Sequence, residues 1–92
     1  MPQIFKIGSY IVYFWINEGK PLEPIHVHVS QGVPSAGSTK IWITRSGKCL
    51  LCNNNSRIPA RILRYVEAVV EARSGEICRQ WVETFGEIRY YC

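Results

Sequence analysis

The chain has 92 residues, which suffices for one small domain with a single hydrophobic core. A hydrophobic content of 47% excludes a disordered polypeptide, and eleven Lys and Arg against seven Glu, with no Asp, leave a formal net charge of +4. This modest positive charge permits RNA or DNA as a partner but is too small for a polycationic tail.

Neither a secretion signal nor an apolar run long enough to cross a bilayer is visible. The longest apolar run covers only residues 11–16. We therefore expect a cytoplasmic protein without a membrane partner, in which the four cysteines are reduced.

The first half of the chain has the alternating, or β-branched and aromatic, patterns that are typical of strands. The predicted strands cover residues 4–7, 10–16, 25–30, 40–44 and 49–52. Arg45-Ser46-Gly47-Lys48 predicts the hairpin turn between the last two strands, and Asn53-Asn54-Asn55-Ser56 ends the sheet. A loop is expected over residues 17–21.

The second half predicts two helices. In the first, Pro59 suits the first turn, and apolar residues recur at helical spacing between Ile62 and Val70. In the second, Ser74 can serve as the N-cap and Gly86 is a plausible stop. Residues 88–92 read as a final extended piece, interpreted as an extra strand.

Strands followed by helices indicate an α+β fold, here a small antiparallel sheet of about four strands followed by two helices that pack on one face. No repeat, low-complexity tract or linker divides the chain, so we expect residues 1–92 to form a single domain. No cofactor is expected.

Both histidines stand two residues apart, in the predicted strand over 25–30. Because strand side chains alternate between the two faces of a sheet, His26 and His28 share one face, while Ile25, Val27 and Val29 point to the other. Two neighbouring imidazoles can share a metal ion, pass a proton or bind a phosphate. They are therefore the first candidates for a functional site.

A metal is the least favoured of these, because zinc normally takes three or four protein ligands and the chain has no third histidine. The remaining potential ligands are Glu18, Glu23, Cys49 and Cys52. The two cysteines would complete a set with the two histidines, but residues three apart on a regular strand face opposite sides. We therefore favour no metal.

Acid–base catalysis is the second interpretation. Histidine titrates near neutral pH, so His26 and His28 can act as the acid and base of a metal-free ribonuclease. Arg57, Arg61 and Arg64 fall at i, i+4 and i+7 on one helix face and would then hold the phosphate. The alternative for these arginines is a solvated helix face paired to nearby glutamates.

The third interpretation, favoured on base rates, is that the exposed or half-buried histidines bind a protein partner or only satisfy backbone groups. The aromatic residues Tyr10, Tyr13, Trp15 and Trp42 are also open to two interpretations. They can form a sheet face that stacks bases, or a core or dimer interface, which we favour. The sequence is compatible with a homodimer.

Several of these residues together resemble the domain of unknown function 4160 family, a group of small, mostly bacterial proteins. The resemblance rests on Met1-Pro2-x-Ile4, Asn17-Glu18-Gly19, His26-x-His28-Val29 and the helix with Trp81, and it covers nearly the whole chain. Members usually carry proline directly before the first histidine, whereas Ile25 follows Pro24 here. The resemblance implies no established activity.

Members are often encoded beside another small protein, so the resemblance implies a protein partner and a toxin–antitoxin-like or regulatory pair. We therefore predict a small bacterial cytoplasmic module that acts with a small protein partner encoded nearby and contacts RNA or DNA. One alternative is the metal-free ribonuclease. The other is a zinc-stabilised protein-binding module that uses His26, His28, Cys49 and Cys52.

Overall fold

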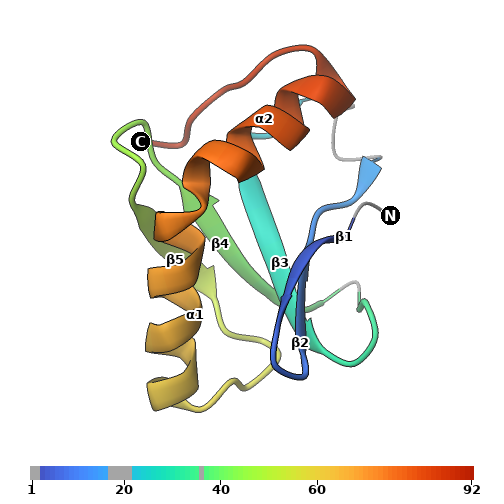
Figure 1. Cartoon of the computed structure of the whole chain (residues 1–92), viewed down its shortest axis with the longest axis vertical. Coiled ribbons are helices and arrows are strands. Elements are labelled where there is room, and N and C mark those ends of the chain that lie inside the picture. The colour runs from blue at the N-terminus through green and yellow to red at the C-terminus, as the bar shows by residue number, and fades with distance from the viewer. Residues whose placement is uncertain (1–2, 17–21, 36) are drawn as a thin grey trace.

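A computed structural model describes residues 3–16, 22–35 and 37–92 (Figure 1). In these residues the strands are β1 Gln3–Ile7, β2 Tyr10–Tyr13, β3 His26–Gln31, β4 Thr39–Ile43 and β5 Cys49–Asn53, and the helices are α1 Ala60–Ala72 and α2 Ser74–Phe85. The predicted α+β fold is confirmed, with five strands where about four were expected. The predicted loop over 17–21 lies outside the described residues.

The five strands form one antiparallel sheet in the order β1-β2-β3-β4-β5, so each strand pairs with its neighbour in sequence. The histidine strand β3 is the central strand. Its register places His28 between Tyr13 on β2 and Lys40 on β4, and it places His26 opposite Trp42 on β4. These cross-strand neighbours build the region around the two histidines.

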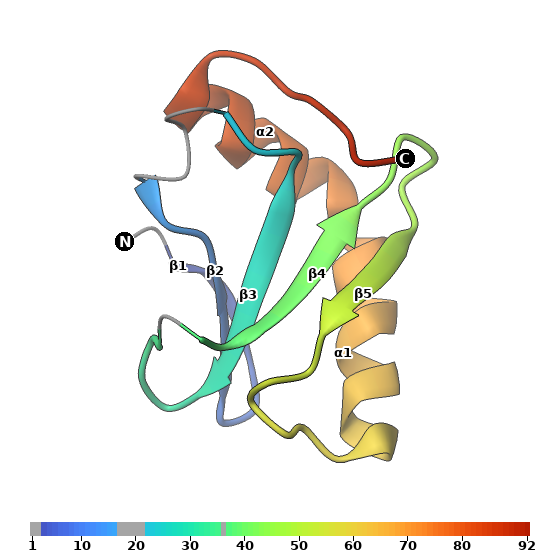
Figure 2. The same cartoon turned by 180° about the vertical axis from the view of Figure 1, so that it is seen from behind.

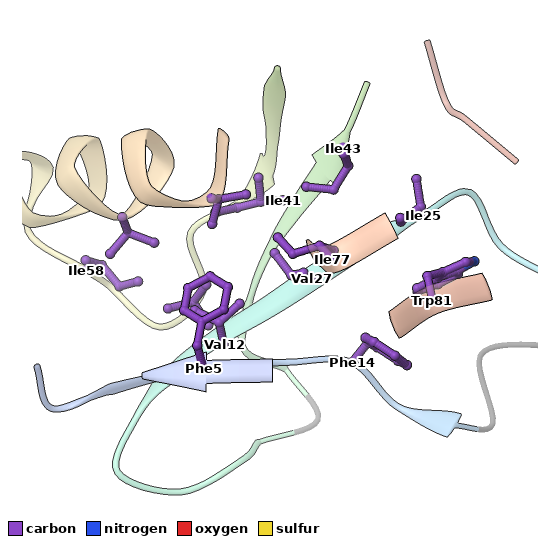
Figure 3. Close-up of a cluster of buried hydrophobic side chains, with 13 residues drawn as sticks. Phe5, Val12, Phe14, Ile25, Val27, Ile41, Ile43, Ile58, Ile77 and Trp81 are labelled. Carbon is purple, nitrogen blue, oxygen red and sulfur yellow. The ribbon is translucent and has the colours of Figure 1, made fainter. Parts of the chain in front are cut away.

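Both helices cover the same side of the sheet, here called the helix face (Figures 1 and 2). The buried core on this face contains Phe5, Val12, Phe14, Ile25, Val27, Val29, Ile41, Ile43, Ile58, Val66, Val70, Ile77 and Trp81 (Figure 3). Each helix contributes two buried residues to this core, Val66 and Val70 from α1 and Ile77 and Trp81 from α2. The two residues of each pair are four positions apart, so they lie on the same side of their helix. Neither helix of the described chain is long and apolar enough to cross a membrane.

Strand β2 is shorter than predicted. Its pairing with β3 ends at the Tyr13–His28 pair, and beyond that pair the two strands diverge (Figure 2). Phe14 instead turns its ring onto Trp81 of α2, with 5.1 Å between the ring centroids. The predicted extension of this strand to residue 16 is therefore wrong, because the core below α2 takes Phe14.

The helix ends agree with the sequence in part. Gly86 ends α2 as predicted, with a φ of 82° that glycine adopts without strain, and its N–H donates to the carbonyl of Val82. The predicted N-cap is wrong by one residue, because the cap position is Arg73 and Ser74 already lies in α2. Arg73 forms an ion pair with Glu76 in the first turn, at 2.8 Å.

The C-terminal segment, residues 87–92, does not form the extra strand that the sequence suggested. It runs from the end of α2 to the β4–β5 hairpin, across one end of the sheet (Figure 1). The carbonyl of Arg89 accepts the N–H of Ile25 at 2.8 Å, and the carbonyl of Cys92 accepts the N–H of Arg45 at 3.1 Å. Ile88 and Tyr90 pack against the core, so the segment closes that end of the domain.

Candidate functional site

The side of the sheet away from the helices, here called the far face, carries both histidines, as predicted. His26 is fully buried and His28 is only 6% exposed, although no helix covers this face. Their expected exposed or half-buried character is therefore wrong. The covering comes from neighbouring rings, from the loop residues 32–35 and 37–38 and from the C-terminal segment.

His26 lies where β2 and β3 diverge, and its ring contacts both sides of the sheet. The ring centroid lies 5.6 Å from that of Trp42 on the far face and 5.4 Å from that of Trp81 in the helical layer. Its Nδ1 lies 2.9 Å from the carbonyl oxygen of Pro24. Because a carbonyl only accepts, this nitrogen carries the hydrogen, which fixes the tautomer and the ring plane.

His28 stacks on Tyr13, with 5.7 Å between ring centroids and 23° between ring planes. The Tyr13 hydroxyl lies 2.6 Å from Ser38 Oγ, accepts the Ser35 N–H at 3.0 Å and is approached by Ser30 Oγ at 3.3 Å. One buried phenol thus holds Ser35 and Ser38 of the loop between β3 and β4 against the far face. Tyr13 is core here, as the favoured interpretation of the aromatic residues predicted.

Lys40 is a neighbour of the histidines that sequence inspection missed. Its Nζ lies 3.0 Å from Glu23 Oε1 and 4.4 Å from the centre of the Trp42 ring, and the residue pairs with His28 across the ladder. Only the strand register brings Lys40 to this place. The alternation of side chains along β4 is the signal that assigns it to the same face as Trp42.

The histidine cluster is suited to holding the fold together. A general acid or base must reach the proton that it transfers, but His26 is sealed between Trp42 and Trp81. The arginines predicted to hold a phosphate are not beside it, because Arg61 and Arg64 lie on the exposed side of α1, which covers the helix face. The structure brings the two histidines together and keeps these arginines away from them.

The two cysteines of β5 differ in surroundings. The register places Asn53 opposite Lys40 and Leu51 opposite Ile41, so Cys52 is the extra residue of a β-bulge. The assumption of a regular strand was therefore wrong. Cys49 points to α1, where its thiol lies 3.8 Å from the carbonyl oxygen of Glu67.

Burial first, and then the carboxylates of Glu71 and Glu67, raise the pKa of the Cys49 thiol to about 12. At neutral pH this thiol stays protonated, which disfavours both redox chemistry and metal ligation. Among residues 3–16, 22–35 and 37–92, no three His, Cys, Asp or Glu side chains lie close enough to hold a metal ion. Glu18, one of the potential ligands, lies outside this part of the chain.

Arg57 has a φ of 55°, the only positive φ among the described residues other than glycine. Asn54 fixes this turn, since its Oδ1 accepts the Ile58 N–H at 3.1 Å and its Nδ2 donates to the Ile58 carbonyl at 2.9 Å. Thr39 Oγ1 also donates to the Asn54 side chain, at 2.8 Å. The backbone of Arg57 is thus held in a left-handed conformation just before α1.

Arg57, Arg61 and Arg64 are exposed, and none of them forms an ion pair with a carboxylate in the described chain. Of the glutamates farther along α1, Glu71 accepts the N–H of Cys49 at 3.0 Å. Tyr65, four residues after Arg61 on the same helix, is 62% exposed. The sequence pattern did not single out this tyrosine. The start of α1 is therefore a basic surface with one exposed aromatic ring.

These features define a small α+β protein with a sequentially ordered antiparallel sheet and a far face covered without helices. A family model described as Domain of unknown function (DUF4160) matches residues 9–82, and the chain belongs to this family. The resemblance seen in the sequence is thereby confirmed. The search of curated proteins and the search of solved structures each find no match.

Proposed function

We propose that this protein is a nucleic-acid-binding module that contacts phosphates through Arg57, Arg61 and Arg64. It acts with a small protein partner in a toxin–antitoxin-like or regulatory pair. The observation that carries the nucleic-acid part is the left-handed backbone of Arg57, shortly before two exposed arginines that have no carboxylate partner among the described residues.

The conformation of Arg57 supports a role for its side chain. A residue with a Cβ in the left-handed region costs roughly 1 kcal/mol relative to glycine, so it persists only where the surrounding structure imposes it. Here the Asn54 side chain, bonded to Ile58 and Thr39, imposes it. Glycine would satisfy the turn with less strain. The arginine is therefore explained by what its side chain binds.

The surroundings of Arg57 favour a polyanion. Three exposed arginines just before and within the first turns of α1 concentrate positive charge there, and the helix dipole adds to it. Arginine presents a planar fork of donors that matches phosphate oxygens, and the exposed ring of Tyr65 offers a face for a base. RNA and DNA both supply this combination.

The partner part of the proposal is supported by β5. This edge strand contains no charged residue, and its Leu50 and Leu51 are 44% and 36% exposed. Natural proteins usually protect an edge strand with charge or proline. We expect Leu51→Lys to abolish co-purification with the small protein encoded nearby, while Val33→Lys at a 72% exposed loop position leaves it intact.

The nucleic-acid part is tested by fluorescence anisotropy with a labelled oligonucleotide at increasing salt. The double variant Arg61→Gln/Arg64→Gln should lower the slope of log K against log salt by about 2, since each lost phosphate contact removes close to one released counterion. Arg57→Gly should also weaken binding, while its thermal stability stays equal to wild type or rises, because the strained backbone is relieved.

The matched control is Lys6→Gln/Arg79→Gln, which removes the same charge from two exposed positions elsewhere. An equal loss of affinity in both double variants would show that only net charge matters and would contradict the proposed surface. If the wild-type protein binds neither RNA nor DNA at low salt, nucleic acid is removed as a partner altogether.

The two alternatives have less support. The ribonuclease requires His26 to reach a substrate, but its ring is fully buried and lies across the sheet from Arg61 and Arg64. The zinc-stabilised module requires thiolates, but the pKa of Cys49 is raised to about 12.

A further inference from the structure

One large aromatic ring stands open on a rigid base at the end of the sheet. Tyr91, in the C-terminal segment, stacks flat on Trp42 of β4, with ring centroids 4.9 Å apart and planes within 6°. Tyr91 is nevertheless 59% exposed, so the Trp42 indole covers one side of the ring and solvent reaches the rest.

The backbone around Tyr91 is fixed on both sides. The Arg89 carbonyl accepts the Ile25 N–H two residues before it, and the Cys92 carbonyl accepts the Arg45 N–H one residue after it. An aromatic ring held in this way loses little conformational freedom when a flat ligand stacks on it.

The Trp42 indole beneath it is fixed as well. The ring of His26 meets it edge-on at 5.6 Å, and the ammonium group of Lys40 lies 4.4 Å from its centre. Tyr91 therefore stands on a pre-ordered stack that reaches into the buried histidine cluster.

Basic residues lie in the hairpin turn that the C-terminal segment reaches, where the Arg45 N–H donates to the Cys92 carbonyl. Arg45 and Lys48 are exposed in the hairpin turn between β4 and β5, and neither forms an ion pair with a carboxylate among the described residues. Arg45 also lies 5.3 Å from the centre of the Tyr90 ring, which orients its guanidinium group beside the C-terminal segment. An exposed ring on a segment that is bonded to a basic turn is complementary to a base whose neighbouring phosphates reach that turn.

We infer that Tyr91 is a stacking platform for one unpaired base of single-stranded nucleic acid, with Arg45 and Lys48 binding the adjacent phosphates. This inference rests on the proposed function and adds the class of nucleic acid. The sequence suggested Tyr13 and Trp42 among the candidates for stacking, but Tyr13 is fully buried and Tyr91 covers Trp42. The stacking surface is the ring of Tyr91, which lies beyond the residues 9–82 matched by the family model.

The test measures the affinity of the full chain for labelled single strands of about twelve nucleotides, as DNA and as RNA, and for the matching duplex. Tyr91→Ala should weaken single-strand binding by about 5- to 150-fold, the range typical of one lost base–aromatic stack, and leave duplex binding unchanged. Tyr91→Phe keeps the ring and should bind as wild type. A preference for one of the two single strands identifies RNA or DNA as the ligand.

Thermal melting of each variant verifies the fold, because Tyr91→Ala also removes the contact with Trp42. If that variant does not fold, Arg45→Gln/Lys48→Gln replaces it, and at least a fivefold loss for the single strand with an unchanged duplex is expected. If the variants bind the single strand as tightly as wild type, or lose equal affinity for duplex and single strand, the stacking platform is overturned while the proposed function stands. Absence of any wild-type binding at low salt overturns the proposed function and this inference together.

Discussion

Val27 and His28 are neighbours in β3, and both are buried, but by different physical means. Val27 packs on the helix face among aliphatic side chains from the sheet and from α1 and α2. His28 lies on the far face against the rings of Tyr13 and His26, beneath a loop that is tied down by hydroxyl groups. One strand therefore supports an apolar layer and a polar layer at the same time.

This difference determines how each layer responds to amino-acid substitution. Apolar burial scales with the area removed from water and tolerates a swap of similar volume. A buried polar group is stable only while its hydrogen bonds are made, so the far face depends on direction as well as volume. The histidines on that face are consequently part of the architecture, and substituting them tests stability before it tests chemistry.

The largest effect should come from the helix face. Trp81 is fully buried and contacts Phe14, Phe85 and His26, so Trp81→Ala creates a cavity where the two layers meet. We expect a loss of about 3–5 kcal/mol in the free energy of unfolding, measured by urea denaturation. Trp81→Phe should recover more than half of this loss. A cost below about 1 kcal/mol would show that the layers do not share this contact.

His26→Ala should have the next largest effect, a loss of about 2 kcal/mol in the free energy of unfolding. The substitution removes three ring contacts and the bond to the Pro24 carbonyl. His26→Phe separates the two causes, since it keeps a ring and loses the bond; about half of the cost should remain. A catalytic histidine without a structural role would leave the free energy of unfolding unchanged on substitution, and that outcome would contradict the architectural role.

Tyr13→Phe should cost about 1 kcal/mol, the typical worth of one hydrogen-bonding group, although it removes no ring. Amide hydrogen exchange should rise at Ser35, whose N–H donates to this hydroxyl. Exchange within β4 is the internal control and should stay slow. Unchanged exchange at Ser35 would mean that this residue is held by other contacts.

The smallest effect should be a pH dependence of the stability that comes from the Cys49 thiol. Because the pKa of this thiol is raised to about 12 from 9.0, the folded chain keeps a proton that the unfolded chain loses above pH 9. The stabilisation is thus fully present below pH 9 and is lost as the pH rises toward 12. Tm should fall more steeply for wild type than for Cys49→Ala between about pH 8 and about pH 10.5.

The pKa of Tyr90 is also raised, first by burial and then by Cys78, and this adds to the decline of Tm in both proteins. Cys49→Ala therefore serves as the background for the comparison. Identical slopes for wild type and variant would show that Cys49 does not titrate differently in the folded and unfolded chains.

Much of the fold was predictable because its signals are local. Alternation identified the strands, spacing identified the stripes of α1 and α2, and Gly86 marked a helix end. The errors also have local causes: Cys52 is an extra residue in a bulge, and Phe14 leaves β2 to meet α2. The alternation of side chains along the sequence reveals neither the position of a bulge nor the point where a strand leaves the sheet to contact a helix.

The candidate site was predictable only in part, because its surroundings come from distant segments. Alternation alone placed His26 and His28 on one face. Their burial depends on a loop fixed by Tyr13 and on a segment some sixty residues away, which no short pattern encodes. Helical spacing found Arg61 and Arg64 on α1 but was wrong for Arg57, which lies before the helix in a left-handed turn that became visible only with its partner Asn54.

The order of the strands has a consequence for how the chain folds. Every strand pairs with its neighbour in sequence, so the sheet can grow by successive hairpins, and its longest connection is the twelve residues 14–25 between β2 and β3. The C-terminal segment is different, because its contacts to Ile25 and Trp42 join residues far apart along the chain. Such contacts carry a larger loop-closure entropy, so docking of Tyr91 should be a late kinetic event, visible as a final change in tryptophan fluorescence.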